Sequence, residues 1–211
     1  MSSRVKFACC CVLAMTALCA VTAASASAFS WWIEKTGGGE EVLKSGMRET
    51  FDPAITGSLP LVLKFGGDEI KCTSGTYKEG FIEGPTGIGA TGIAYEGCTV
   101  VKPSGCSIEG GKISTAELTG SISLSGSTVE FTFKPKSGTQ FAEINTTGSG
   151  CSLGKLKAIG SISGSVTKPK ELTKEKAFDI EPAHSSLTIA ATKAEPSGND
   201  GYSAERGWSA H

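Results

Sequence analysis

Residues 128–134 read Thr-Val-Glu-Phe-Thr-Phe-Lys, and this stretch decides the fold class. Its apolar residues Val129, Phe131 and Phe133 occupy every second position, which places them on one face of a β-strand and the polar residues on the other. Residues 59–65, Leu-Pro-Leu-Val-Leu-Lys-Phe, carry the same alternation of leucine and phenylalanine. Both stretches predict strands that are buried on one side only.

Two longer stretches, 116–124 and 156–166, also alternate, and both contain Gly-Ser-Ile-Ser. Glycine inside a strand tolerates a bend, a bulge or a close approach of backbone. Glycine-bearing turns separate further strand candidates, which are residues 69–74, 92–101, 140–145, 178–181 and 186–193. Many strands with little intervening helix predict an all-β fold, an antiparallel β-sandwich with a β-barrel as the alternative.

Two segments lack this alternation. Residues 169–177 follow a proline and concentrate Lys and Glu, so they fit a short helix or a charged connection equally well. Residues 194–211 contain proline, glycine and serine and show no periodicity before Trp208. We therefore expect a single β-domain over residues 29–193, followed by a loose C-terminal extension at 194–211.

The first 28 residues have the organisation of a secretory signal peptide. Arg4 and Lys6 form a short basic region, a mostly apolar uncharged run follows, and Ala26-Ser27-Ala28 supplies an A-x-A cleavage site. Cleavage is expected between Ala28 and Phe29. The protein is then secreted, to the extracellular space or the cell envelope.

An uncleaved anchor and a lipoprotein are the alternatives to a cleaved signal. A membrane-spanning helix needs about 20 apolar residues with anchoring flanks, whereas this run ends in small residues, Ala, Ser and Thr. Cys19 directly follows Leu18, where a lipidated cysteine would follow a small residue. No later segment is apolar enough to span a bilayer, so no transmembrane segment is expected after cleavage.

Cleavage changes the composition of the chain. All 28 glycines lie among the 183 residues that remain of 211, about twice the usual share. Two of the 20 basic residues are lost, which leaves 18 against 21 acidic residues and a net charge of −3. Nucleic-acid binding is not expected, because it requires basic surfaces that contact phosphates.

Four of the eight cysteines lie beyond the signal segment: Cys72, Cys98, Cys106 and Cys151. An even number in an oxidising compartment predicts two disulfides. Four cysteines permit three connectivities that the sequence alone does not separate, and the working hypothesis pairs Cys72 with Cys98 and Cys106 with Cys151. Zinc sites use closely spaced cysteine pairs, while the nearest two cysteines here have seven residues between them. No metal or other cofactor is expected.

Residues 87–92, Gly-Ile-Gly-Ala-Thr-Gly, match the pattern G-x-G-x-x-G. In a dinucleotide-binding fold this pattern opens a helix, whose N-terminus receives the pyrophosphate. The residues that follow, 93–98, are strand-like and soon reach Gly97 and Cys98. Nucleotide binding is therefore not expected.

The sequence offers few catalytic groups. His184 lies in a predicted loop and is expected to be a surface imidazole, and no nucleophile elbow accompanies it. Two carboxylates could hydrolyse a polysaccharide; their spacing singles out no pair among the candidates Glu79, Glu83, Glu96, Glu109, Glu130 and Glu143. Sugar stacking would need exposed rings from a modest stock of Trp31, Trp32, Tyr77, Phe81, Tyr95, Tyr202 and Trp208. Asn145-Thr146-Thr147 forms an N-glycosylation sequon.

Several motifs within residues 60–170 resemble uncharacterised secreted proteins that are abundant in some high-GC Gram-positive bacteria. These proteins pair an I-x-C strand with a G-C strand and end with a Gly-Ser strand. The resemblance implies an all-β secreted domain with disulfides and brings no known activity. The motifs that carry it are Ile70-Lys71-Cys72, Glu96-Gly97-Cys98, Gly105-Cys106-Ser107, residues 113–120, Phe141-Ala142-Glu143-Ile144 and Gly160-Ser161-Ile162.

Three functions remain open from the sequence. The leading hypothesis is a non-catalytic β-domain that binds or decorates the cell envelope, with a cell-wall glycan or another envelope protein as partner. A secreted polysaccharide hydrolase would show two acids converging in a concave pocket. A small-ligand carrier would need a hollow barrel interior of several hundred Å³.

Overall fold

The computed structural model describes residues 29–52 and 59–211. The predicted signal peptide up to Ala28 lies outside these residues. Strands dominate, and the one helical element of the described ranges is a 3₁₀ turn at Glu109–Gly111. The predicted all-β class is confirmed. Across the same two ranges, no helix is long and apolar enough to cross a membrane.

Eight antiparallel strands close into a barrel. Each pairs with the next, and the last pairs on its other side with the first, so the sheet has no free edge. Of the two architectures considered, the barrel is the one formed, because this final pairing joins what would be the open edges of a sandwich. The strands are, in ring order, β3 (Arg48–Asp52), β7 (Phe81–Glu83), β8 (Gly87–Ala90), β13 (Leu118–Ser125), β14 (Thr128–Pro135), β17 (Ile162–Val166), β18 (Thr173–Ile180) and β20 (Thr192–Ala210).

Aromatic side chains fill this barrel, which we call the aromatic barrel. The rings of Phe131 and Phe178 lie 4.9 Å apart, and that of Phe178 stacks 6.0 Å from the indole of Trp208. Trp208 in turn packs edge-on against Trp31, at 5.2 Å. All four rings are almost fully buried. The alternation predicted for residues 128–134 is confirmed, since Val129, Phe131 and Phe133 all point inward.

Most of the other strands form a second half, which we call the disulfide lobe. Two strands of this lobe pair with the first half of β20. These are β4 and β19. Its interior is mainly aliphatic. Its strands are β4 (Leu59–Phe65), β5 (Asp68–Cys72), β6 (Ser74–Lys78), β9 (Gly92–Glu96), β10 (Thr99–Lys102), β11 (Ser107–Ile108), β12 (Lys112–Thr115), β15 (Gln140–Thr147), β16 (Lys155–Ile159) and β19 (Thr188–Ile189).

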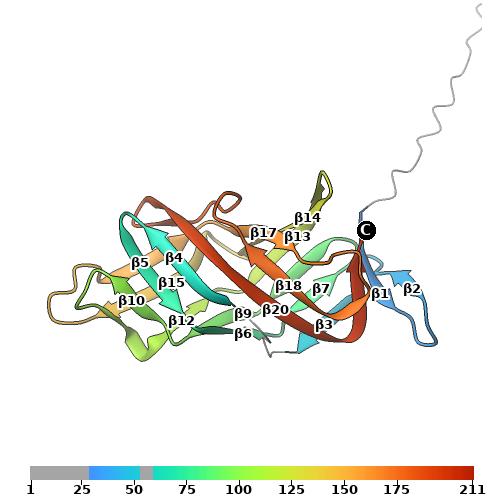
Figure 1. The fold of residues 1–211 in the computed structure, drawn as a ribbon, viewed down its shortest axis with the longest axis horizontal. Coiled ribbons are helices and arrows are strands. Elements are labelled where there is room, and N and C mark those ends of the chain that lie inside the picture. Colours follow the sequence, from blue (N-terminus) through green and yellow to red (C-terminus); the bar gives the residue numbers. More distant parts are fainter. Residues whose placement is uncertain (1–28, 53–58) are drawn as a thin grey trace, which may run out of the picture.

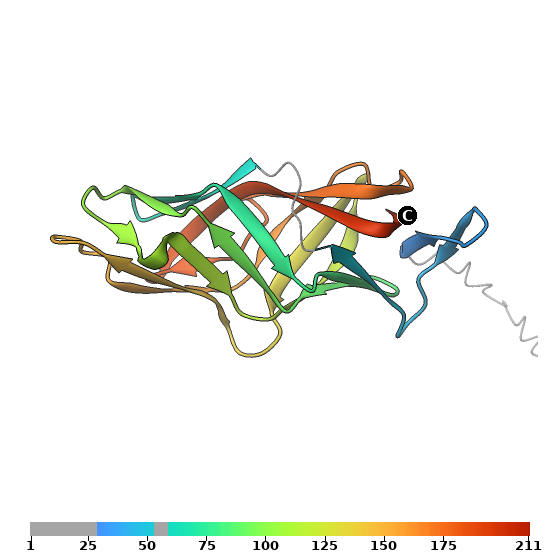
Figure 2. The ribbon, with the colours of Figure 1, turned by 90° about the horizontal axis from the view of Figure 1, so that it is seen from below.

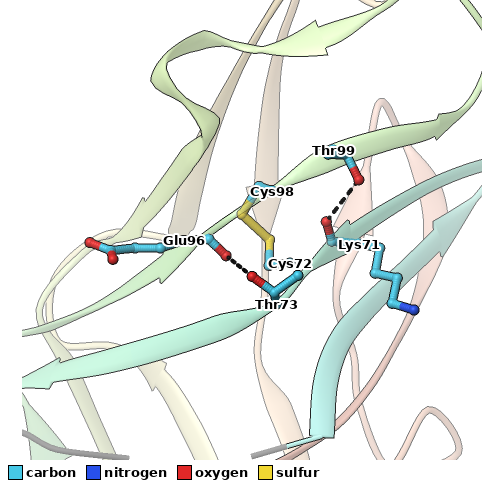
Figure 3. Close-up of a disulfide and its surroundings, with 6 residues drawn as sticks. All are labelled: Lys71, Cys72, Thr73, Glu96, Cys98 and Thr99. Atoms are coloured by element: carbon cyan, nitrogen blue, oxygen red, sulfur yellow. Dashed lines mark hydrogen bonds between the residues drawn. A yellow bond between two sulfur atoms is a disulfide. The ribbon is translucent and has the colours of Figure 1, made fainter.

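Both predicted disulfides are present in this lobe. β5 and β6 form a nearly continuous run that pairs with β9 and β10, with Ser74 opposite Glu96 and Lys71 opposite Thr99. This register puts Cys72 directly opposite Cys98, with their Cα atoms 3.9 Å apart, and the bond joins them across the two strands (Figure 3). Cys106 bonds Cys151 across a sequence separation of 45 residues.

A single long strand runs through both halves of the molecule. β20 extends over 19 residues and runs diagonally through the middle of the molecule in Figure 1, with the disulfide lobe at one end and the aromatic barrel at the other. The end-to-end arrangement is equally visible from below in Figure 2. The predicted loose extension at 194–211 is therefore wrong. Its inward positions hold small residues such as Ala194 and Ala204, and shifts in register with β4 and β18 interrupt the alternation.

Two other segments differ from their predictions. Residues 169–177 form no helix, because most of them belong to β18 and Lys176 is directed inward. The predicted strand at 156–166 is two strands, β16 and β17, separated at Gly160. That glycine has a φ of 115°, and a Cβ there would lie 2.3 Å from the carbonyl oxygen of Ser186. Only glycine fits such a corner.

A short hairpin closes the outer end of the aromatic barrel. It consists of β1 (Trp31–Glu34) and β2 (Glu40–Val42), and β1 pairs with the last residues of β20. Trp31 and Ile33 point inward and are fully buried. The hairpin therefore plugs the barrel, and the interior of that end is packed.

Candidate functional site

A polar groove runs across the outer wall of the aromatic barrel, and we call it the trough. Its main part has a volume of about 380 Å³, and it adjoins a second hollow of about 360 Å³ that shares Thr119. The lining of the main part is Arg48, Thr50, Glu79, Phe81, Glu83, Thr91, Glu117, Leu118, Thr119 and Lys136. The second hollow adds Gly120, Ser121, Thr132 and Lys134.

The strand register explains why a groove exists there. One row of facing residues crosses the wall as Thr50, Phe81, Gly89, Thr119 and Lys134. The neighbouring row, by the same pairings, is Arg48, Glu83, Gly87, Ser121 and Thr132. In both rows the position on β8 is a glycine. The floor of the trough is therefore formed by the Phe81 ring, which lies across Gly89, and by the half-buried backbone at Gly87, between two lines of side chains.

The glycines of this floor are those of the G-x-G-x-x-G match. β8 runs directly into β9 with only Thr91 between them, so no helix follows the motif. At Gly89 a Cβ would lie 2.5 Å from Cζ of Phe81 and 2.8 Å from the carbonyl oxygen of Leu118. The glycine is thus required because the phenylalanine ring of the neighbouring strand lies across it.

Two ion pairs border the trough. Arg48 Nη2 lies 3.1 Å from Glu83 Oε2, and the guanidinium also stacks 3.7 Å from the centre of the Phe81 ring. On the other side, Lys136 Nζ lies 2.6 Å from Glu117 Oε1. All four charged side chains are substantially exposed, so these pairs add little to stability and mainly fix the shape of the rim.

The acidic residues considered for catalysis are distributed over the whole surface. Glu79 and Glu83 are brought together in the trough, whereas Glu96 binds Lys112 at 2.9 Å on the disulfide lobe. Glu109 lies in the 3₁₀ turn. Glu143 binds Lys155 at 2.8 Å, and the hydrogen bond from that ammonium lowers the pKa of the carboxyl group.

His184 lies between two carboxylates. Its Nδ1 is 3.7 Å from Glu130 Oε1 and 3.7 Å from Glu181 Oε2. The nearby hydroxyl of Ser165 donates to Glu181 at 2.7 Å, so it is directed at the acid and not at the imidazole. The contacts differ from a serine triad, in which the hydroxyl bonds the histidine. In the described parts of the chain, no cluster of three or more His, Cys, Asp or Glu could hold a metal.

The most perturbed group is Lys176, at the outer end of the aromatic barrel. Its Nζ donates to the carbonyl oxygens of Lys168, at 2.9 Å, and Glu171, and to Thr173 Oγ1 at 3.3 Å. It also lies 5.3 Å from the centre of the Trp208 ring. Burial lowers the pKa of Lys176 to about 8, against the opposing effect of Glu171. All three ammonium protons are used within the protein, so the residue is a structural cap.

Most of the aromatic residues considered for sugar stacking are not free to stack on a sugar in the fold. Trp31, Tyr77, Tyr95 and Trp208 belong to the core. Trp32 stacks on the imidazole of His211, with ring centres 4.7 Å apart. The side chain of Tyr202 lies outside what the structure describes. Among the other residues named for stacking, Phe81 is the one that lines the trough.

The sequence did not single out most of the trough. Arg48, Thr119 and Lys136 carry no motif, and they meet only through the register of five strands. The one usable signal was the alternation of glycine with apolar residues at 87–90, which marks a strand face without side chains.

The chain matches no protein-family model, no curated protein and no solved structure. The candidate site therefore rests on geometry and chemistry alone.

Proposed function

We propose that the protein is an exported, non-catalytic binding domain that holds a ligand of the cell envelope in the trough. The observation that carries this proposal is the groove on the barrel wall, about 380 Å³ in volume, which polar side chains border around the Phe81 ring. The signal-like N-terminus and the two disulfides support a location outside the cytoplasm. A cell-wall glycan or another envelope protein would be the partner.

Non-catalytic binding fits the trough better than hydrolysis. Glycoside hydrolysis needs one carboxyl group kept protonated and a second kept ionised. Glu83 and Glu117 are instead each held in an ion pair with a cation of the rim.

A carrier function has less support from the interior. An apolar cavity inside the disulfide lobe, bordered by Tyr95, Ile113 and Phe141, has a volume of about 30 Å³. That is about the space of one water molecule, whereas ligand pockets measure about 300 Å³ or more.

Sedimentation with isolated cell envelopes tests the proposal. We suggest envelopes of a high-GC Gram-positive bacterium, with Ser121→Trp as the blocking variant. Ser121 is exposed and faces Gly87, so the indole would lie over the floor. Ser123→Trp is the matched control, on an exposed position of the same strand face outside the trough lining.

The mature wild-type protein and Ser123→Trp should sediment with the envelopes, and Ser121→Trp should lose at least tenfold in affinity. Thermal melting of all three proteins checks that the barrel is intact. Equal binding by the two variants would contradict the proposal.

A further inference from the structure

The charges around the trough cancel. Its two hollows are bordered by three cations, Arg48, Lys134 and Lys136, and by three carboxylates, Glu79, Glu83 and Glu117. Two of the cations are held in ion pairs with carboxylates of the same rim. A charged ligand that bound one of these paired groups would have to displace its partner, and the six charges of the rim sum to zero.

The strands beneath the trough offer no backbone groups to a partner. β7, β8, β13 and β14 are each paired on both sides within the barrel. A peptide that binds by adding a strand needs a free edge, and this wall has none. Recognition must then come from side chains, and those that β13 and β14 contribute include three hydroxyl groups, namely Thr119, Ser121 and Thr132.

The long direction of the trough crosses the strands. The main part covers the side of β7 and the second hollow the side of β14, and they meet at Thr119 on β13. From β7 to β14 there are three strand spacings, about 14 Å. This length suits a short oligosaccharide whose units lie one after another across the wall.

We propose that the ligand of the trough is an uncharged glycan, which lies along the trough across β7, β8, β13 and β14. This inference rests on the proposed binding function. Hydroxyl groups of the glycan exchange hydrogen bonds with threonine and serine hydroxyls, and the balanced rim excludes acidic polymers. Because no net charge is involved, binding should depend little on salt.

The test uses polysaccharide released from the same envelopes and separated by anion exchange into a neutral and an acidic fraction. Each fraction is titrated calorimetrically into the wild-type protein, Ser121→Trp and Ser123→Trp. We expect the neutral fraction to bind wild type and Ser123→Trp at least tenfold more tightly than it binds Ser121→Trp. Partial hydrolysates of that fraction should gain affinity with length up to a few units and then level off.

A charge variant sharpens the test. Glu83→Gln leaves Arg48 without its carboxylate and gives the rim one net positive charge. Relative to wild type, it should raise the ratio of affinity for the acidic fraction to affinity for the neutral fraction at least threefold.

The outcomes separate this inference from the proposed function. Trough-dependent binding of the acidic fraction alone would overturn the neutral class and leave the binding function standing. Envelope binding that is sensitive to Ser121→Trp but absent from both fractions would point to an envelope protein and would also overturn it. Envelope binding that Ser121→Trp does not affect would remove both proposals.

Discussion

The aromatic barrel and the disulfide lobe share β20, yet they are held together differently. The barrel interior contains the large rings Phe131, Phe133, Phe178 and Trp208, and both disulfides lie in the other half. The lobe interior combines isoleucine, leucine and alanine with the buried rings Phe65, Tyr77, Tyr95 and Phe141. The two buried tryptophans, Trp31 and Trp208, pack together in the barrel, where the indoles bury some of the largest apolar areas of any side chain. The comparison teaches that both halves have an apolar core, and that both covalent bonds lie in the half without a buried tryptophan.

The largest effect on stability should come from removing a large side chain from the barrel interior. Trp208→Ala removes a fully buried indole that contacts Trp31, Phe51 and Phe178, and we expect a loss of about 3–5 kcal/mol in the free energy of unfolding. Guanidinium titration measures it. Trp32→Ala, whose indole is only partly buried, should cost much less. Similar losses for the two variants would refute the importance of the aromatic core.

Removing the covalent bonds should affect the lobe first. In the chain-entropy model, loops of 26 and 45 residues correspond to about 3.5 and about 4 kcal/mol. We expect the double variant Cys72→Ala/Cys98→Ala to lose up to the first amount. Hydrogen exchange should show faster amide exchange in β5 and β9, while β14 and β18 stay protected. Uniform acceleration in both halves would show that the two halves unfold as one unit.

Lys176 provides a pH test confined to the barrel. The unfolded chain holds this proton up to a pH near 10.4, whereas in the folded protein the pKa is about 8. Between these values the unfolded state binds more protons, so the contribution of Lys176 to the free energy of unfolding rises with pH. The difference between wild type and Lys176→Met should therefore grow in favour of wild type from pH 8 to 10, by on the order of 2 kcal/mol. Lys174→Met, on an exposed position, should show no such slope.

The smallest effect concerns two buried serines. The hydroxyl of Ser209 has no hydrogen-bond partner among the described residues, whereas that of Ser185 accepts from Ser163 N and donates to the Glu181 carbonyl. Ser209→Ala should raise the free energy of unfolding by up to about 1 kcal/mol, and Ser185→Ala should lower it by about the same amount. Chemical denaturation resolves both. A loss in Ser209→Ala would reveal a partner for that hydroxyl.

Sequence patterns predicted the local elements better than their arrangement. Alternation located β4 and β14, and the compartment argument led to both disulfides. The strand β20 was not predicted, because alanine and glycine at inward positions leave no periodic pattern of large hydrophobic residues. The choice of barrel over sandwich also depended on that strand, since β20 closes the ring.

The trough was not predicted from the sequence, for a related reason. Gly87 and Gly89 were visible as a motif, but their meaning depends on which residues face them in β7 and β13. Register between strands that are distant in sequence is set by the whole ring, and no single segment encodes it. The neighbours Thr119 and Ser121 were therefore ordinary strand residues until the pairing was known.

The shared strand also sets an order of events during synthesis. β20 follows the other described strands along the chain, so it leaves the ribosome after them, and it supplies pairings to both halves. Until residues 192–210 are available, the barrel lacks one of its strands and β4 lacks its pairing with β20. The earlier strands stay partly assembled until then, because the contacts that complete them span much of the chain. Completion of these two sheets is thus tied to the synthesis of residues 192–210, and a chain that lacked them would have two unfinished sheets instead of one finished half.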